Sequence, residues 1–145
     1  MRRVRLIAMC LVAGTACTGA AQACTISATG VNFGAYDPRS STAKDSTGGV
    51  TLNCPSNRSG VVSMTKGGST TYFPRRMMSG TNQLTYNLFT NSTRSTGWGD
   101  GTGGSATSSV ARGFSGTLII YGRIPAGQNV RAGSYTDTVT VTVTF

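Results

Sequence analysis

The sequence contains no histidine and no glutamate among its 145 residues. Its acidic residues are Asp37, Asp45, Asp100 and Asp137. A serine nucleophile needs a neighbouring base, and the usual one, histidine, is missing. A serine–lysine pair would have to use Lys44 or Lys66, both in polar segments that keep an amine solvated. Hydrolysis by paired carboxylates needs two acids in contrasting environments, whereas all four aspartates lie in or beside predicted turns. The sequence therefore predicts no catalytic residue, and we expect the protein not to be an enzyme.

Metal and cofactor sites also lack the residues that they need. Two thiols without histidine are too few ligands for zinc. The glycine-rich segment 98–104 holds a single carboxylate, Asp100, which is far short of the oxygen ligands that calcium takes. The same segment has no Lys-Ser/Thr pair and opens no helix, so it does not match a phosphate-binding loop. We expect no metal and no cofactor, and we interpret the segment as a turn that folds Trp98 onto the body of the domain.

The only long apolar stretch lies at the N-terminus, within a pattern typical of a secretory signal peptide. Met1 to Arg5 is basic, residues 6–13 are apolar but too short to span a bilayer, and Ala21-Gln-Ala23 fits the small-x-small cleavage rule. We predict that residues 1–23 are a signal peptide, and that the protein is exported through the inner membrane.

The cysteines indicate one disulfide. Cys10 and Cys17 leave with the predicted signal peptide, and Cys24 and Cys54 remain as a pair in an oxidising compartment. A bridge between them closes a loop of about 30 residues, which is worth about 3–4 kcal/mol in the chain-entropy model. It would also hold the first mature residue in the fold.

Positive charge exceeds negative charge, but it forms no stripe. Loss of Arg2, Arg3 and Arg5 with the signal peptide lowers the net charge from +9 to +6. Apart from Arg75-Arg76 the arginines are scattered, and export takes the protein away from nucleic acid. We expect no nucleic-acid partner, and contact with an acidic polysaccharide or an anionic cell surface stays open.

Helix-forming residues are scarce after residue 24, and alternating β-branched residues are common. The clearest alternation is at the C-terminus, where valines and Phe145 occupy one face of residues 138–145 and threonines the other. Further strands are predicted at 24–28, 50–54, 61–66, 84–90 and 117–124, the last the most apolar and therefore central. Residues 31–34 are either a short second strand or the continuation of the first strand after a glycine bulge at Gly30. Residues 37–49, 91–116 and 125–133 are predicted loops. The fold class is all-β, a sandwich or small barrel.

Residues 72–78 combine apolar and basic side chains and have two interpretations. Pro74 cannot donate to a β-ladder, so the segment can be an edge whose Phe and Met cover the core. Alternatively, it forms a binding surface for sugar or an anionic polymer. The candidates for such a surface are Tyr72, Phe73, Arg75, Arg76 and Trp98.

Seven ordered motifs resemble the spore coat protein U domain family, and are similar to subunits of archaic chaperone–usher pili. These motifs are ACTISATGVNFGAYDP (23–38), Cys54, RMM (76–78), LTYNLF (84–89), WGDGTG (98–103), YGRIPAGQ (121–128) and GSYTDTVTVTVTF (133–145). The resemblance covers essentially the whole of residues 24–145, which we identify as one such domain.

The resemblance implies an incomplete immunoglobulin-like sandwich that lacks one strand. A periplasmic chaperone would fill the gap first, and at an outer-membrane usher a donor strand from the next pilin or coat subunit would replace it. The assembly face would then be Val139, Val141, Val143 and Phe145. An open edge beside them would expose apolar side chains and unpaired backbone groups, and strand addition cures both. The implied location is the periplasm, then a pilus or coat at the cell surface.

One departure from the pilin pattern affects the predicted role. Pilins of this kind carry a donor segment before the first cysteine, whereas cleavage after Ala23 leaves Cys24 first. We therefore expect a strand-accepting terminal or accessory subunit, or a coat protein that associates through another edge. The alternative is a free-standing secreted module that binds carbohydrate or an anionic surface. A chaperone and usher encoded beside the gene would favour assembly, and a lone gene would favour the module.

Overall fold

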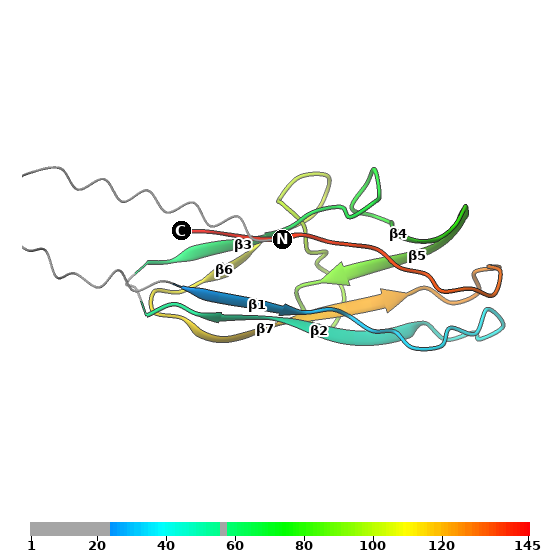
Figure 1. Cartoon of the computed structure of the whole chain (residues 1–145), viewed down its shortest axis with the longest axis horizontal. Helices are drawn as coiled ribbons and strands as arrows, with labels where there is room; N and C mark the ends of the chain where they lie inside the picture. The colour runs from blue at the N-terminus through cyan, green and yellow to red at the C-terminus, as the bar shows by residue number, and fades with distance from the viewer. Residues whose placement is uncertain (1–23, 56–57) are drawn as a thin grey trace, which may run out of the picture.

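The computed structural model describes residues 24–55 and 58–145, and within these ranges all regular structure is β (Figure 1). The strands are β1 (Thr25–Thr29), β2 (Lys44–Asn53), β3 (Gly60–Met64), β4 (Arg75–Ser79), β5 (Asn82–Phe89), β6 (Ser108–Val110), β7 (Ser115–Ile124) and β8 (Val141–Thr144). The predicted signal peptide lies outside the described residues. No helix in the described ranges is long and apolar enough to cross a membrane.

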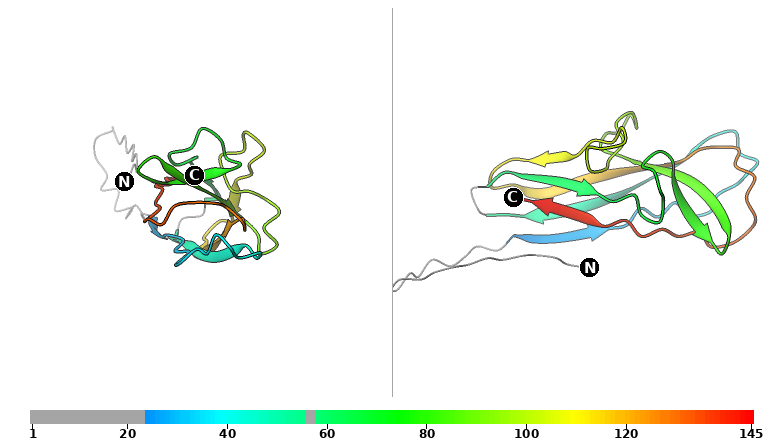
Figure 2. Two further views of the ribbon diagram at one scale, coloured as in Figure 1. Left: turned by 90° about the vertical axis from the view of Figure 1, so that its right-hand side faces the viewer. Right: turned by 90° about the horizontal axis from the view of Figure 1, so that it is seen from above.

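The strands form two antiparallel sheets that face each other in an immunoglobulin-like β-sandwich (Figures 1 and 2). One sheet has the order β1-β2-β7-β5-β4 and the other has the order β6-β3-β8. The all-β class is therefore confirmed. The most apolar predicted strand, β7, is also central, and it pairs with β2 along ten residues from Lys44↔Ile124 to Asn53↔Ser115.

Alternation along the strands produces the core. Val50 and Leu52 of β2 are fully buried, and Leu84 of β5 in the same sheet is buried too. Val62 and Met64 of β3 supply the second layer. Because successive residues of a strand point to opposite faces, the polar residues between these positions lie on the solvent side. The core therefore lies between the sheets, as the period-two pattern predicts.

Three predicted boundaries are wrong, for identifiable reasons. β2 begins at Lys44 inside the predicted loop 37–49, because its Ser, Thr and Gly residues pair with the apolar end of β7. β6 lies inside the predicted loop 91–116 and pairs with β3 over three residues only. Residues 31–34 form no regular strand. For β2 and β6, tertiary pairing and not local propensity decides the outcome. Residues 31–34 instead pack the side chains of Val31 and Phe33 against Gly122 of β7.

The last predicted strand is shorter as a regular ladder than its alternation suggests. β8 pairs with β3 from Val61↔Thr144 to Met64↔Val141. Upstream, Thr65 N donates to Thr140 O at 3.0 Å, and Thr136 forms an isolated bridge with Met78 of β4. The segment 136–145 thus has backbone hydrogen-bond partners along one side, first in β4 and then in and beside β3.

The structure joins Cys24 and Cys54 in a disulfide. Cys54 is buried, and Cys24 packs against the core beside the start of β1. The bridge therefore ties β1, which is an edge strand, to the end of β2.

An ion-pair network lies on the outer face of the five-stranded sheet. Arg123 donates through Nε and Nη2 to the two carboxylate oxygens of Asp45, at 2.7 and 2.8 Å. Arg94 adds a second cation at 3.3 Å, and its guanidinium lies 5.7 Å from the centre of the Tyr121 ring. The hydrogen bond from Arg123 holds the pKa of Asp45 below its usual value of 3.8.

This lowered pKa predicts a pH dependence of stability. A carboxyl with a depressed folded-state pKa stabilises the fold above its unfolded pKa, and the contribution disappears as the pH falls through the folded value. We expect Asp45→Asn to lower the free energy of unfolding at pH 7 by about 1 kcal/mol or less, since the pair is partly exposed. The difference between wild type and variant should shrink towards zero below pH 3.8. Urea denaturation from pH 7 to pH 2 measures it, and a difference that does not change with pH would contradict the assignment.

Candidate assembly groove

One side of the sandwich is sealed and the opposite side is open. On the sealed side, residues 97–106 bridge the sheets: Trp98 N donates to Leu88 O of β5, and Met64 N of β3 donates to Gly99 O, at 2.9 and 3.0 Å. On the other side β1 ends one sheet and β8 ends the other. In the described part of the chain, no strand pairs with the second edge of either.

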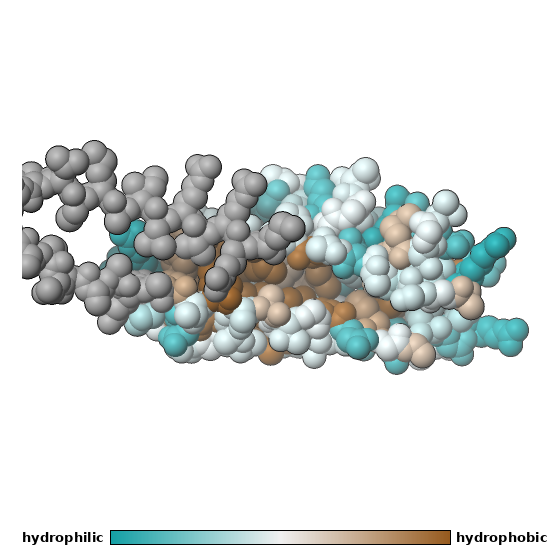
Figure 3. All heavy atoms as spheres, viewed as in Figure 1, coloured by the Kyte–Doolittle hydropathy of each residue, from teal (hydrophilic) through white to brown (hydrophobic). Residues whose placement is uncertain are grey.

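The open side shows apolar side chains between the two sheet edges. Figure 3 shows them as a band along the middle of this face, between polar side chains above and below. Ile26 of β1 points inward beside Leu52, yet it stays 40% exposed. Since β1 has no neighbour on this side, nothing in the described structure covers the inward face that Ile26 presents.

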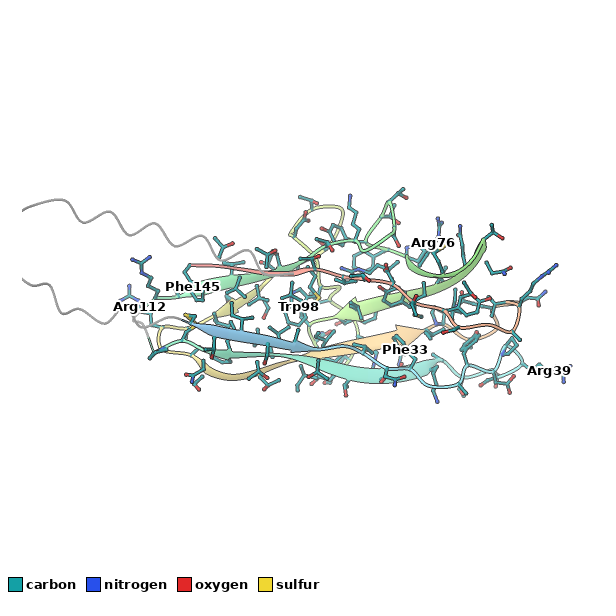
Figure 4. The ribbon with its side chains drawn as sticks, viewed as in Figure 1. Phe33, Arg39, Arg76, Trp98, Arg112 and Phe145 are labelled. Carbon is teal, nitrogen blue, oxygen red and sulfur yellow. A yellow bond between two sulfur atoms is a disulfide. The ribbon has the colours of Figure 1, made fainter. Side chains whose placement is uncertain are left out.

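The predicted assembly residues lie on the facing edge. Val139, Val141 and Val143 are half-buried and pack against the core. Phe145 is 43% exposed, and Figure 4 shows it at the end of the final strand. A Cβ at Gly60 would lie 2.9 Å from its ring, so the ring rests on the bare backbone of β3. The structure therefore brings all four residues to the open side, with the intervening threonines facing outward.

Further along, the opening widens into a cavity of about 1040 Å³. One wall is formed by residues 30–38 and the other by residues 130–137, and the floor is Met77, Leu84 and Ile124. We call the whole opening, from Ile26 and Phe145 to this cavity, the assembly groove.

The first wall stands close to the sheet because glycine gives it room. A Cβ at Gly122 of β7 would lie 2.7 Å from both the Phe33 ring and a Val31 methyl group. Phe33 is therefore buried against β7, and its ring packs edge-on against Tyr86 with 6.1 Å between the ring centres. The glycine in the YGRIPAGQ motif thus positions the aromatic of the ACTISATGVNFGAYDP motif.

Asp137 is a polar group in this apolar setting, and its carboxylate is held by three donors. Tyr86 OH donates to Oδ2 at 2.6 Å, and Gly68 N and Thr138 N each donate to Oδ1 at 2.8 Å. A side chain at Gly67 would collide with the carboxylate, and Gly67 has the left-handed φ of +68° that favours glycine. Burial and the hydrogen bond to Asp137 raise the pKa of the Tyr86 hydroxyl. Asp137 therefore fastens the turn after β3 to the second groove wall.

The predicted surface-contact set is wrong for three of its five members. Trp98 is 1% exposed and Tyr72 is buried, and Arg75 is 0% exposed. Trp98 Nε1 donates to Val62 O at 3.0 Å, and Figure 4 shows the indole between the two sheets. Arg76 is exposed and Phe73 half-buried, so they do not form a joint surface with the others.

Arg75 is buried because backbone carbonyls receive its guanidinium. Arg75 Nη2 donates to Thr65 O and Trp98 O at 2.9 and 2.7 Å. The guanidinium carbon Cζ lies 5.2 Å from the centre of the Tyr72 ring. Burial lowers the pKa of this guanidinium. Its Nη1 has no hydrogen-bond partner within the described residues. Arg75 thus joins the β3–β4 loop to the loop that holds Trp98, a role that the alternating pattern of the sequence does not reveal.

No chemistry of bond making is visible at the groove. Among residues 24–55 and 58–145, no three His, Cys, Asp or Glu side chains lie close enough to hold a metal ion. What the groove presents is apolar surface between two strand edges that are unpaired in the described residues.

The comparisons with known proteins agree with this geometry. The model of the Spore Coat Protein U domain matches residues 11–142. The chain is 35% identical over 128 residues to Protein U of Myxococcus xanthus, covering 79% of this chain and 71% of that protein. It also resembles a complex between a chaperone and a tip adhesion subunit, from archaic chaperone–usher Csu pili of Acinetobacter baumannii, with a TM-score of 0.57 and 27% identity. That match covers 85% of this chain, which spans 39% of the matched chain.

Asp137 provides a stability test of the groove wall. We expect Asp137→Asn to lower the free energy of unfolding by about 2 kcal/mol, because hydrogen bonds to a charged group contribute about 1.5–3 kcal/mol and the bond from Tyr86 is partly buried. Asp37→Asn is the matched control, since its carboxylate accepts from Arg39 N at 2.9 Å within its own exposed turn, and its loss should be clearly smaller than that of Asp137→Asn. Denaturant titration measures both, and equal losses would contradict the role given to Asp137.

Proposed function

The chain belongs to the Spore Coat Protein U domain family, and from this premise we propose that it is a structural subunit of a secreted surface assembly, a chaperone–usher pilus or a coat. The observation that carries the proposal is the assembly groove, where the described residues place no strand between β1 and β8 on one side of a two-sheet sandwich. Its role is association and not catalysis.

The proposed occupant of the groove is an extended strand from a partner. A strand laid beside β8 would pair its backbone with the unpaired edge and place alternate side chains on the core. Ile26, Val139, Val141 and Val143 would then lose their remaining contact with water. Complete burial of an exposed valine or isoleucine is worth about 1.5–3 kcal/mol, and these partly buried residues would each gain a part of that, so the four together would support stable assembly.

The partners follow from the same geometry. The structural neighbour is a complex of a chaperone with a pilus subunit, and this supports a periplasmic chaperone as the first partner of this chain. The outer-membrane usher and further pilin or coat subunits complete the proposed route. Residues 1–23 would direct export to the periplasm, from which the domain at 24–145 would reach the cell surface. We assign no nucleic-acid partner, and contact with polysaccharide is not needed for this role.

The position in the assembly is proposed to be terminal or accessory. Cleavage after Ala23 would make Cys24 the first residue, and the disulfide fixes Cys24 to Cys54 of the same domain. Such a subunit receives a strand but has none to give. Mass spectrometry of the exported protein should find Cys24 at the N-terminus, and a mature form that begins a dozen or so residues earlier would contradict the terminal position.

Thermal unfolding with a synthetic strand tests the groove. The probe is a 12-residue peptide of alternating Val and Thr. One version carries a Lys pair at its N-terminus and the other at its C-terminus, so that in either strand direction one version leaves the charged pair at the open end of the groove. We expect it to raise the Tm of oxidised 24–145 by about 10 °C when its concentration is about 100 times Kd. Val141→Ser should weaken binding about tenfold, because it removes an apolar contact from the groove. Thr142→Ser, one residue along and facing outward, should leave it unchanged.

A peptide in which prolines replace alternate threonines is the control ligand, since proline cannot donate to a ladder. If the protein alone unfolds cooperatively as a monomer and no strand peptide moves its Tm, the fold needs no partner strand. The free-standing binding module would then be the better account.

A further inference from the structure

The distal end of the assembly groove is tied shut by two side chains from opposite parts of the sequence. Tyr36 belongs to the first groove wall, and its OH donates to Pro125 O and accepts from Gln128 N, both at 2.9 Å. Pro125 and Gln128 begin the connection from β7 to the second groove wall. We call Tyr36 and Gln128 the distal lock.

Gln128 extends the lock to β5 by acting as a short substitute strand. β5 pairs with β7 only over Asn87–Phe89, which leaves the backbone of Thr85 without a strand neighbour on that side. Thr85 N donates to Gln128 Oε1 at 2.8 Å, and Gln128 Nε2 donates to Thr85 O at 2.9 Å. The side-chain amide thus reproduces both hydrogen bonds of a ladder residue, and it holds the connection in one place.

This connection crosses from one sheet to the other at the end of the groove (Figures 1 and 2). It leaves β7 at Ile124, meets the far edge strand β4 of the same five-stranded sheet where Thr136 bridges Met78, and then continues into β8 of the three-stranded sheet. On its way it supplies the second wall of the cavity, residues 130–137, while Tyr36 anchors it to the first wall. A strand that lies along β8 therefore meets a crossing chain when it arrives at the lock.

We propose that the distal lock makes the groove a dead end, and that it thereby fixes the length and register of the strand that the groove accepts. The proposal rests on the proposed function. A strand that pairs with the open edge of residues 136–145 can be about ten residues long, or about 33 Å at 3.3 Å per residue. A slip by two residues would keep the apolar side chains on the core face, so alternation alone cannot set the register. The lock supplies the missing stop.

The test is a length series of the repetitive Val-Thr peptide with 6, 8, 10, 12 and 14 residues, in both Lys-tagged versions. A repetitive sequence has no register of its own, so only the end of the groove can limit it. In wild type, each added Val-Thr pair should raise the affinity about tenfold up to about ten residues, and further pairs should add less than twofold. An affinity that keeps rising through 14 residues would overturn the dead end without any variant.

Two variants locate the stop. Tyr36→Phe keeps the ring and removes both hydrogen bonds of its hydroxyl, and Gln128→Leu keeps the size and removes the substitute strand. In each variant the peptide length at which affinity stops rising should increase by at least two residues. Tyr135→Phe is the matched control, because Tyr135 lines the same cavity but its OH donates only within its own loop, to Arg131 O at 2.7 Å. Its plateau should equal that of wild type.

The outcomes separate the two proposals. If peptides bind wild type with a plateau that neither lock variant moves, the lock is not the stop and the assembly groove remains. If no peptide of any length binds wild type, the proposed function fails, and the lock is then only a structural tie of the loop.

Discussion

An unpaired sheet edge beside exposed apolar core is the constraint on which the rest of this structure depends. Backbone N–H and C=O groups at an edge must find partners, and apolar side chains beside them must be covered. On one side of the sandwich the chain meets both needs itself, because residues 97–106 bond to β5 and β3 and seat Trp98 between the sheets. On the other side, between β1 and β8, the described chain does neither.

The features around the opening keep its walls in place while it stays unfilled. The disulfide holds β1 to β2, Asp137 holds the second wall to the turn after β3, and Tyr36 joins the two walls at the far end. Glycines at Gly60 and Gly122 let Phe145 and Phe33 lie on bare backbone. Under the proposed function, a groove built in this way would be ready for a strand before one arrives, which would lower the ordering cost of binding.

The sequence predicts the fold class, the pairing of cysteines and the face of the last strand, because these follow from alternation and residue counting. It does not predict β2 from Lys44 or β6, since polar residues become strands there through long-range pairing. It also assigns Tyr72, Arg75 and Trp98 to a surface, although carbonyl acceptors and cross-chain packing bury them. The second wall and the distal lock consist of loop residues without periodicity. The ACTISATGVNFGAYDP, YGRIPAGQ and GSYTDTVTVTVTF motifs include their residues, but the physical roles of these residues require the tertiary structure.

Hydrogen exchange at residues 136–145 tests the central claim most directly, because it reads the unpaired edge itself. In the isolated domain, amides of this segment that point away from β3 and β4 should exchange as fast as those of exposed loops, while the amides of β7 stay protected. Addition of the 12-residue Val-Thr strand should slow exchange of the outward amides, and more so as the bound fraction rises. Exchange in the loop 98–104 should not change. Full protection of residues 136–145 before any strand is added would show that the edge is already paired, and would contradict the account.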